Sequence, residues 1–149
     1  MHRKRQYRGL LRPHLYPAIR VRLGQWLSSR GLASAVIDTS DGLSTDLSHL
    51  CEASSVGAVV YAERVPLPRV PAELQKRGIN PLRLALHGGE DYELLFTVPS
   101  RLEKRIPRSV AGVSLTPIGI ITRQHRVRIE KAGSVKTLIP FGWDPFRGR

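Results

Sequence analysis

The chain has 149 residues, 41% of them hydrophobic, and a formal net charge of +12 at pH 7. This is about the length of one domain, and the composition excludes wholesale disorder. No apolar run approaches the ~20 residues that a membrane-spanning helix needs. The single cysteine, Cys51, excludes an internal disulfide and a cysteine-rich zinc site. We therefore expect a soluble, cytoplasmic protein that does not associate with membranes.

The positive charge is concentrated toward the two ends of the chain. Residues 1–37 contain eight Lys or Arg and no acid, whereas residues 38–99 contain five basic and nine acidic residues. Residues 100–149 contain eleven basic and three acidic residues. A basic chain favours polyanionic partners, but an acidic middle is not typical of a uniform nucleic-acid-binding surface. The acidic residues of the middle segment therefore need a separate explanation.

The N-terminal third is predicted to contain an arm, a helix and a strand. Residues 1–14 are expected to form an exposed basic arm, and residues 15–149 a single domain. Pro17 is well suited to begin a helix, and Gly31 to end it. The apolar stripe of this helix has helical spacing and consists of Ile19, Leu23, Trp26 and Leu27. A short buried strand is predicted over residues 33–37.

The segment 38–43 is predicted as a strand-to-helix turn, with Ser40 or Asp41 capping the helix. The buried face of that helix is expected to hold Leu43, Leu47, Leu50 and Cys51. A strand is predicted over residues 58–61, after Gly57. Short helices are expected to begin at Pro71 and at residues 80–81.

The second half is predicted to be rich in strands. Residues 87–91 form a sharp turn before a strand over 92–98, and Ser100 is expected to cap a helix that reaches about Ile106. Further strands are predicted over residues 113–121, 127–130 and 135–139. This mixture favours a mixed α/β (α+β) domain, with a single mixed sheet covered by helices.

The first candidate site is the sequence Asp38-Thr39-Ser40-Asp41-Gly42. Two carboxylates and a hydroxyl occur where a buried strand meets a helix N-terminus, which favours anions such as phosphate. Mg²⁺ would reconcile carboxylates with phosphate, because it takes oxygen ligands from both. The alternative is that these residues only cap the helix.

Two further sequences are candidates for ligand binding. In Gly88-Gly89-Glu90-Asp91, acids at the start of a strand could bind a metal or a cationic ligand, or could form an ordinary solvated turn. Trp143 could stack on a flat or cationic ring, or could pin the C-terminal segment to the core. No nucleophile motif and no histidine pair with metal-ligand spacing occurs in the chain.

Both motifs resemble signature segments of the thiamine-monophosphate kinases. The matching sequences are Ala35-Val36-Ile37-Asp38-Thr39-Ser40-Asp41-Gly42-Leu43 and Gly88-Gly89-Glu90-Asp91-Tyr92-Glu93-Leu94-Leu95-Phe96. The terminal sequence Gly142-Trp143-Asp144-Pro145-Phe146 is similar as well. The resemblance runs from about residue 11 to residue 146 and implies a domain like the C-terminal domain of aminoimidazole ribonucleotide synthetase.

The resemblance also implies an activity and a set of site residues. It implies a kinase that uses ATP and Mg²⁺ to phosphorylate thiamine monophosphate to thiamine diphosphate, without a covalent enzyme intermediate. By position in the motifs, Asp38 and Asp41 would bind Mg²⁺ and Ser40 would contact ATP. Glu90 and Trp143 would contact the thiamine phosphate substrate.

Family members have an additional N-terminal half, and we expect this half to be absent here. In the family that half carries further Mg²⁺-binding aspartates and much of the nucleotide site, so we expect this chain to need it as a partner for activity and the intact enzyme to be a homodimer. The alternatives are an RNA-binding or other polyanion-binding module without catalytic activity, and a remnant without function. The motifs favour the kinase over nucleic-acid binding.

Overall fold

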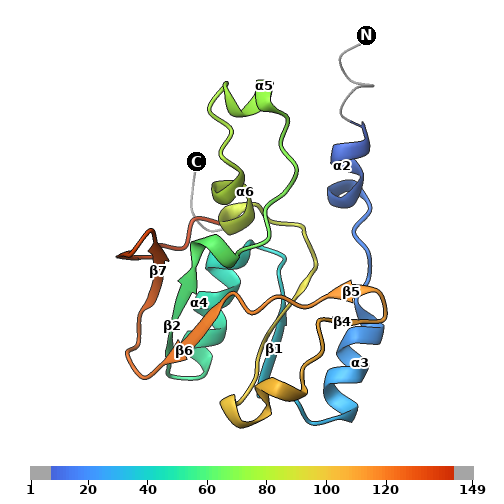
Figure 1. Cartoon of the computed structure of the whole chain (residues 1–149), viewed down its shortest axis with the longest axis vertical. Helices are drawn as coiled ribbons and strands as arrows, with labels where there is room; N and C mark the ends of the chain where they lie inside the picture. Colours follow the sequence, from blue (N-terminus) through green and yellow to red (C-terminus); the bar gives the residue numbers. More distant parts are fainter. Residues whose placement is uncertain (1–7, 143–149) are drawn as a thin grey trace.

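The computed structural model describes residues 8–142, with side chains from residue 12 onward (Figure 1). Within the described residues, helices predominate before residue 94 and strands predominate after it, in a mixed α/β domain. In chain order the elements are α2 (Arg8–Leu15), α3 (Val21–Ser29), β1 (Ala35–Asp38), α4 (Leu43–Ala53), β2 (Gly57–Tyr61), the 3₁₀ helix η1 (Ala62–Arg64), α5 (Ala72–Gln75), α6 (Pro81–His87), β3 (Leu94–Thr97), the 3₁₀ helix η2 (Ser100–Arg105), β4 (Ser109–Val110), β5 (Val113–Ser114), β6 (Gly119–Thr122), β7 (Val127–Lys131) and β8 (Ser134–Thr137).

Over residues 8–142 the strands form three sheets, whereas the sequence predicted a single one. The largest is a mixed four-stranded sheet in the order β6-β2-β7-β8, with β2 antiparallel to β6 and parallel to β7. Because β6 and β7 occupy both edges of β2, β1 has no place beside it and pairs with β3 instead, Ala35 opposite Thr97 and Asp38 opposite Leu94. Strands β4 and β5 form a small hairpin. The mixed α/β class is confirmed, and the single sheet is corrected.

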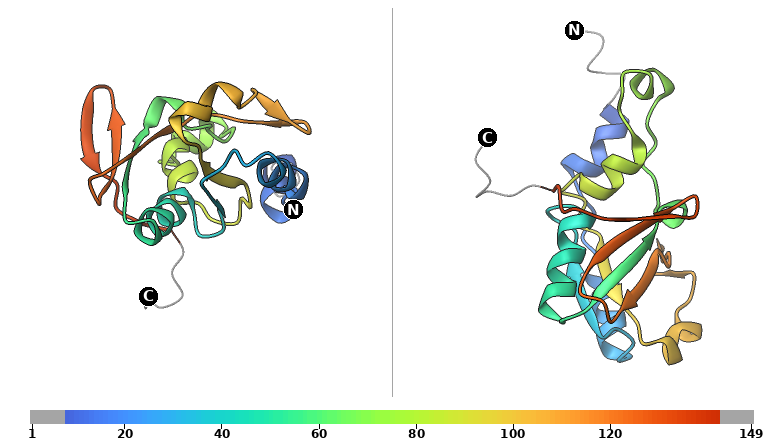
Figure 2. Two further views of the ribbon diagram at one scale, coloured as in Figure 1. Left: turned by 90° about the horizontal axis from the view of Figure 1, so that it is seen from below. Right: turned by 90° about the vertical axis from the view of Figure 1, so that its left-hand side faces the viewer.

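The hydrophobic core lies where α4 packs against the four-stranded sheet (Figure 2). The predicted apolar face of α4 is confirmed, with Leu47, Leu50 and Cys51 buried and Leu43 half-buried. Helix α4 also contacts β1 and α6. The core cluster combines residues of α4, β2, α6, β7 and the neighbouring loops: Leu47, Cys51, Ala58, Val60, Val65, Leu86, Val127 and Leu138. This arrangement fixes the N-terminal end of α4, where the acidic motif lies.

Several boundaries differ from the sequence predictions. Helix α3 begins at Val21, and Ile19 is 86% exposed, so Ile19 does not belong to the buried stripe. Arg20, directly before α3, is paired with Glu93, and this tertiary contact leaves no trace in the helical pattern. The predicted strand 113–121 is broken into β5 and β6 on either side of Pro117, which has no N–H to donate to a strand partner.

The N-terminal segment also departs from the expected arm. Helix α2 (Arg8–Leu15) occupies part of the residues 1–14 that were predicted as an exposed arm. The side chains of residues 12–14 are exposed. Over residues 8–142, no helix is both long enough and apolar enough to cross a membrane.

Candidate functional site

The two motifs singled out in the sequence lie side by side in the structure. We call residues 38–42 the acidic loop and residues 88–91 the glycine loop. The backbone N–H of Glu90 donates to the carbonyl of Ser40 at 2.8 Å, and the N–H of Tyr92 donates to the carbonyl of Thr39 at 3.0 Å. In return, the N–H of Thr39 donates to the carbonyl of Glu93 at 2.9 Å. The pairing of β1 with β3 therefore continues into the two loops and joins them.

Glycines make this close approach possible. A Cβ atom on Gly89 would lie 2.5 Å from the carbonyl oxygen of Ser40, which is too close for any residue other than glycine at this position. Gly42 has a φ of +108°, and a Cβ atom there would lie 3.1 Å from the carbonyl carbon of His87. Because glycine has no Cβ atom, Gly42 and Gly89 allow the backbones of the two loops to approach this closely.

The first turn of α4 holds the acidic loop through a buried carboxylate. The cap expected from Ser40 or Asp41 is not formed, because the N-terminal cap residue is Gly42, which makes no side-chain hydrogen bond. Instead, Oδ2 of Asp46 accepts the backbone N–H of Asp41 at 3.2 Å. Asp46 is only 2% exposed. Burial is the main cause that raises the pKa of Asp46, and the nearby carboxylate of Asp41 raises it further.

Asp41 and Asp46 could hold a metal ion. Within the described part of the chain, ligand atoms of Asp41, Asp46 and His49 all lie within 4.8 Å of one another. The two carboxylates are the oxygen donors that Mg²⁺ prefers, whereas an imidazole suits transition metals better. This donor set fits Mg²⁺ through its two carboxylates. Asp38, exposed at the end of β1, is not part of the group.

Asp46 was not among the site residues predicted from the sequence, although its helical spacing distinguishes it from other acidic residues. It lies three residues after Leu43 and four before Leu50, so helical spacing places it on the apolar face of α4. Charged residues are rarely buried unless they are paired. An acid on the apolar face of a helix that begins in an acidic motif is therefore a candidate for holding that motif.

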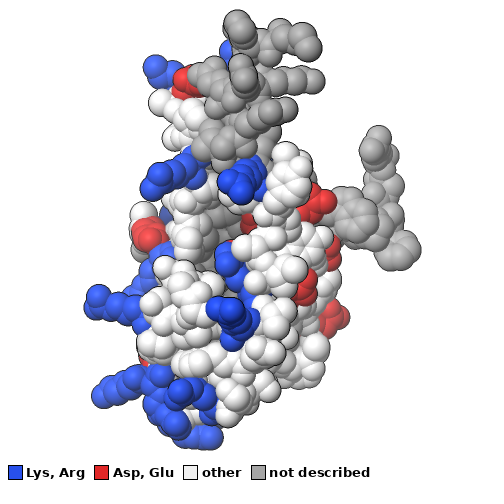
Figure 3. Space-filling model, turned by 90° about the vertical axis from the view of Figure 1, so that its right-hand side faces the viewer, with Lys and Arg blue, Asp and Glu red and all other residues white. Residues whose placement is uncertain are grey.

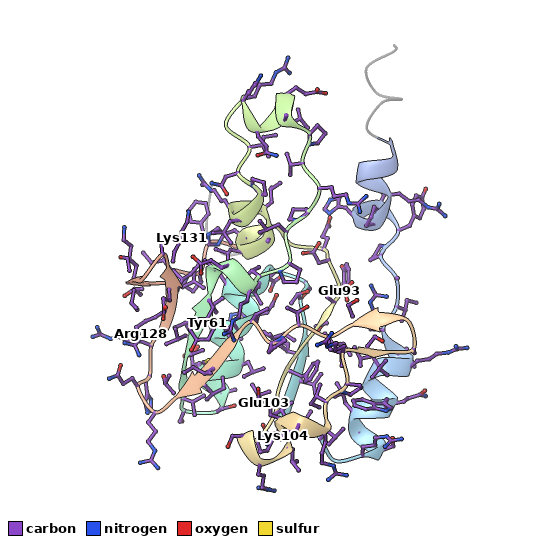
Figure 4. All side chains as sticks on the ribbon, in the orientation of Figure 1. Tyr61, Glu93, Glu103, Lys104, Arg128 and Lys131 are labelled. Carbon is purple, nitrogen blue, oxygen red and sulfur yellow. The ribbon has the colours of Figure 1, made fainter. Side chains whose placement is uncertain are left out.

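The acids of the glycine loop and of the residues after it face the N-terminal segment. Oε2 of Glu90 lies 3.1 Å from Nε2 of His14, and Nε of Arg20 donates to Oε2 of Glu93 at 2.8 Å. Figure 4 labels Glu93, which points toward the segment between α2 and α3. Partial desolvation is the main cause that raises the pKa of Asp91, and the carboxylate of Glu93 raises it further.

Two residues in and directly after the glycine loop have backbone conformations that L-residues rarely adopt. Glu90 and Tyr92 have φ values of 65° and 50°. Such conformations persist only where the surroundings impose them, and they are common at functional sites. Here the hydrogen bonds to the acidic loop impose them, so the direction of the Glu90 side chain is set by the contact between the two loops.

The last described residues lie against the acidic loop. Trp143 is outside the described residues. The N–H of Gly142, the residue before it, donates to Oγ1 of Thr45 at 3.1 Å, and the N–H of Phe141 donates to Oγ of Ser44 at 3.5 Å. A Cβ atom on Gly142 would lie 1.9 Å from the carbonyl oxygen of Asp41.

A groove of about 420 Å³ opens beside the glycine loop. Phe141 lies at its edge, with its ring centroid 5.9 Å from that of His87 and 5.5 Å from the guanidinium carbon of Arg83. Nδ1 of His87 is 2.8 Å from Oγ of Ser44. The groove is lined by Gly78, Ile79, Asn80, Arg83, Leu84, His87, Gly88 and Phe141. It is therefore continuous with the glycine loop and with the end of the described chain.

Comparison with known proteins identifies close similarity to one group of enzymes. The chain is 43% identical over 119 residues to the thiamine-monophosphate kinase of Escherichia coli K12, covering 76% of this chain and 34% of that protein. It is 39% identical over 140 residues to the thiamine-monophosphate kinase of Salmonella typhimurium, covering 91% of this chain and 40% of that protein. The chain thus spans about two fifths of the length of these relatives or less. No family model matches it.

Solved structures agree with the sequence comparison. A complex described as AaThiL with AMPPCP and TMP superposes with a TM-score of 0.69 at 34% identity, over 93% of this chain and 41% of that one. A HypE–HypF complex superposes with a TM-score of 0.64 at 19% identity, over 80% of this chain and 40% of that one, a likeness that shows the fold alone. The fold is that of aminoimidazole ribonucleotide synthetase-like proteins. The chain is therefore a relative of the thiamine-monophosphate kinases and corresponds to the C-terminal portion of those proteins.

Proposed function

We propose that this chain supplies the C-terminal part of an enzyme that transfers the terminal phosphoryl group of ATP to thiamine monophosphate, with Mg²⁺, and so forms thiamine diphosphate. One observation carries the proposal above the others. The two segments that resemble kinase signatures lie 45 or more residues apart in the sequence, yet their backbones are hydrogen-bonded to each other at the N-terminal end of α4. The similarity to thiamine-monophosphate kinases supports the same conclusion.

The acidic loop is proposed to hold Mg²⁺. Asp38 and Asp41 are its proposed ligands, and Asp46 is added because its carboxylate belongs to the same group as that of Asp41. When bound, Mg²⁺ would neutralise the charge of the phosphate groups that must approach each other. The hydroxyl of Ser40 is proposed to contact ATP, on the basis of its position in the motif that resembles the thiamine-monophosphate kinases.

The glycine loop is proposed to receive thiamine monophosphate. Glu90 is its proposed contact, and its side chain is 63% exposed, so it remains available to a ligand although it is paired with His14. Trp143 is proposed to lie against the ring system of the substrate, which carries a cationic ring that an indole face attracts. The position of Gly142 against Asp41 supports this role for the residue that follows it.

The proposed reaction does not require a side chain that acts as a nucleophile or as a general base. The acceptor is already an ionised phosphate, so the residues of the site need to bind, orient and neutralise rather than to abstract a proton. This agrees with a site built from carboxylates and backbone groups. We assign no nucleophile and no general base.

The proposed partners follow from the length of the relatives. The remaining portion of those proteins has no counterpart in residues 8–142. We propose that a portion of this kind completes the site and that the intact enzyme is a homodimer. We also propose that the protein acts in the cytoplasm.

The test is a chimera in which this chain replaces the matching C-terminal portion of the Escherichia coli thiamine-monophosphate kinase. We expect the chimera to form thiamine diphosphate from thiamine monophosphate and Mg-ATP, and this chain alone to be much less active. The proposal fails if a folded chimera that binds Mg-ATP forms no thiamine diphosphate. An otherwise identical chimera carrying Asp41→Asn controls for activity that does not need the acidic loop.

A further inference from the structure

Two basic side chains near the N-terminus are paired with acids of residues 90–93, which we call the strained turn because two of its residues have a positive φ. His14, in the last turn of α2, lies 3.1 Å from Glu90, between Nε2 and Oε2. Arg20, directly before α3, donates from Nε to Oε2 of Glu93 at 2.8 Å and from Nη2 to Oε1. The strained turn is therefore held from the side of α2 and α3 as well as by the acidic loop.

The contact of Arg20 with Glu93 is the stronger of the two. It joins two nitrogens to two oxygens, and such forked pairs fix the geometry of a carboxylate as well as contributing energy. The side chain of Arg20 is 24% exposed, whereas those of His14 and Glu90 are 49% and 63% exposed. Single contacts between exposed charges contribute little. Arg20 is therefore the residue that anchors the strained turn on this side.

The place of Arg20 in the fold is not explained by the helix that follows it. Its carbonyl accepts the N–H of Gly24 at 3.0 Å, so Arg20 stands at the N-terminal end of α3. The positive end of the helix dipole disfavours a cation there, and Ser, Thr, Asp or Asn is usual at this position. The carboxylate of Glu93, 73 residues away in the sequence, supplies the missing reason.

Glu93 links Arg20 to the conformation of the strained turn. The carbonyl of Glu93 accepts the N–H of Thr39 in the acidic loop at 2.9 Å, while Arg20 holds its side chain. Glu90 and Tyr92, just before it, keep φ values of 65° and 50°, which persist only where the surroundings impose them. If Glu93 is released, the turn can relax toward ordinary φ values, and the side chain of Glu90 changes direction.

We infer that Arg20 is a positioning residue, which by holding Glu93 keeps the strained turn in the conformation that presents Glu90 to thiamine monophosphate. This inference deepens the proposed kinase function and rests on it for its catalytic consequence. The effect of Arg20 on the strained turn does not depend on that function, so the two are tested separately.

The structural half is tested by amide hydrogen exchange in this chain, followed by NMR. The amides of Glu90 and Tyr92 report on the turn, because they donate to carbonyls of the acidic loop. Arg20→Met keeps a long side chain but removes every donor, and we expect both amides to exchange about 3- to 10-fold faster, the worth of one hydrogen bond. Arg20→Lys keeps the charge without the fork and should restore part of the protection. Unchanged exchange of both amides in Arg20→Met would overturn the inference.

Two controls separate this effect from a general loss of stability. Arg22→Met removes an exposed arginine from the same helix and should leave both amides unchanged. The amide of Tyr61, which donates to the carbonyl of Ile118 at 2.8 Å, lies in the four-stranded sheet and should keep its exchange rate in Arg20→Met. Equal acceleration by Arg22→Met, or of Tyr61 in Arg20→Met, would show that Arg20 has no specific effect on the turn.

The catalytic half is tested in the chimera with the Escherichia coli enzyme. Arg20→Met should raise the KM for thiamine monophosphate about 3- to 10-fold and leave the KM for ATP within about twofold, because Glu90 moves while the acidic loop stays held by Asp46. Arg20→Lys should restore part of the affinity, and Arg22→Met should change neither KM. Equal changes in both KM values, or no change, would contradict positioning of Glu90.

A second variant covers the case in which Arg20→Met does not fold. Glu93→Ala breaks the same ion pair from the other side and leaves α3 intact, so it should accelerate exchange of the Glu90 amide and raise the KM for thiamine monophosphate in the same way. Slow exchange and a normal KM in Glu93→Ala would overturn the inference. If the chimera with Arg20 intact is inactive, the proposed function fails, while the exchange measurements still decide whether Arg20 holds the strained turn.

Discussion

At the scale of single residues, the buried carboxylate of Asp46 is the feature on which the geometry of the acidic loop depends most. It is 2% exposed and accepts the N–H of Asp41. The carboxylate of Asp41 is close enough to contribute to the raised pKa of Asp46. A bound divalent cation would relieve this repulsion.

Removing this carboxylate should destabilise the fold. We expect Asp46→Ala to lower the free energy of unfolding by about 1–3 kcal/mol, because the backbone N–H of Asp41 loses its partner. Urea unfolding followed by circular dichroism measures this change. Glu52→Ala, on the exposed side of the same helix, should change it by less than about 0.5 kcal/mol. Equal effects of the two substitutions would show that Asp46 does not hold the loop.

His87 should make stability depend on pH. Its pKa is lowered from the ordinary 6.5 by burial and then by Arg83. Below pH 6.5 the unfolded chain therefore takes up this proton before the folded chain does, and stability falls as the pH decreases toward the lowered folded value. The groups that face its ring are Arg83, Ser44 and Phe141.

The measurement compares the free energy of unfolding at pH 7.5 and pH 5.5. The wild-type chain should lose more stability on acidification than His87→Asn, because asparagine takes up no proton. Groups that titrate elsewhere contribute equally to both proteins. The same loss in both would mean that His87 keeps its ordinary pKa in the folded state.

Sequence patterns indicated some of these residues and not others. Asp38, Ser40, Asp41 and Glu90 could be named because they lie in two short motifs. Whether they bind ligands stays a prediction. The hydroxyl of Thr45 could not be assigned, because its partner Gly142 lies 97 residues away. Nothing in local sequence states which distant backbone N–H a hydroxyl will accept.

At the scale of elements, the contact between the acidic and glycine loops depends on backbone atoms rather than on side chains. Gly89→Ala should therefore lower the free energy of unfolding by about 1–3 kcal/mol, since its Cβ atom would lie 2.5 Å from the carbonyl oxygen of Ser40. Thermal unfolding measures the effect. A melting temperature equal to that of the wild type would contradict the close contact.

Replacing Gly24 with alanine should stabilise the fold, in contrast to Gly89→Ala. It lies inside α3, and a Cβ atom there would lie at an ordinary 3.8 Å from a methyl group of Leu94. Gly24→Ala should raise the free energy of unfolding by about 0.5–1 kcal/mol, because alanine loses less backbone freedom in a helix. This variant is the matched glycine-to-alanine control for Gly89→Ala. Destabilisation by Gly24→Ala would show that α3 packs more tightly than described.

The local elements were predicted better than their pairing. The helix of α4 and the strand of β2 follow from the spacing of apolar residues, and α6 from Asn80 and Pro81, with Asn80 accepting the N–H of Arg83 as a cap. The division into three sheets could not be predicted, because strand pairing depends on which edges remain free after β6 and β7 have paired with β2. Contacts of that kind join residues far apart in the sequence.

At the scale of the whole molecule, charge and apolar surface are distributed unevenly. Figure 3 shows Lys and Arg side chains along the whole length of one face and most densely at its lower end, with Asp and Glu mainly along its right margin. The chain from the last residue of α2 to the first residue of α3 exposes large apolar side chains, with Leu15, Tyr16, Ile19 and Val21 at 61%, 77%, 86% and 56%. Such a cluster is unusual for a surface that faces only water.

This apolar segment should limit the solubility of the chain on its own. We expect Ile19→Gln to raise the concentration at which the isolated chain self-associates, without lowering its melting temperature, because Ile19 contributes little to the core. Sedimentation velocity over a range of concentrations measures self-association. Unchanged self-association would mean that Ile19 takes no part in it.

We propose that the acidic loop supplies Mg²⁺ ligands to a thiamine-monophosphate kinase. The most direct test is the rate of thiamine diphosphate formation by the Escherichia coli chimera as a function of Mg²⁺ concentration, with Asp41 and with Asp41→Asn. We predict that Asp41→Asn lowers the rate at saturating ATP at least about tenfold and shifts half-maximal activity to higher Mg²⁺, because a ligand is lost. An Asp41→Asn chimera with the same rate and the same Mg²⁺ dependence would contradict the claim.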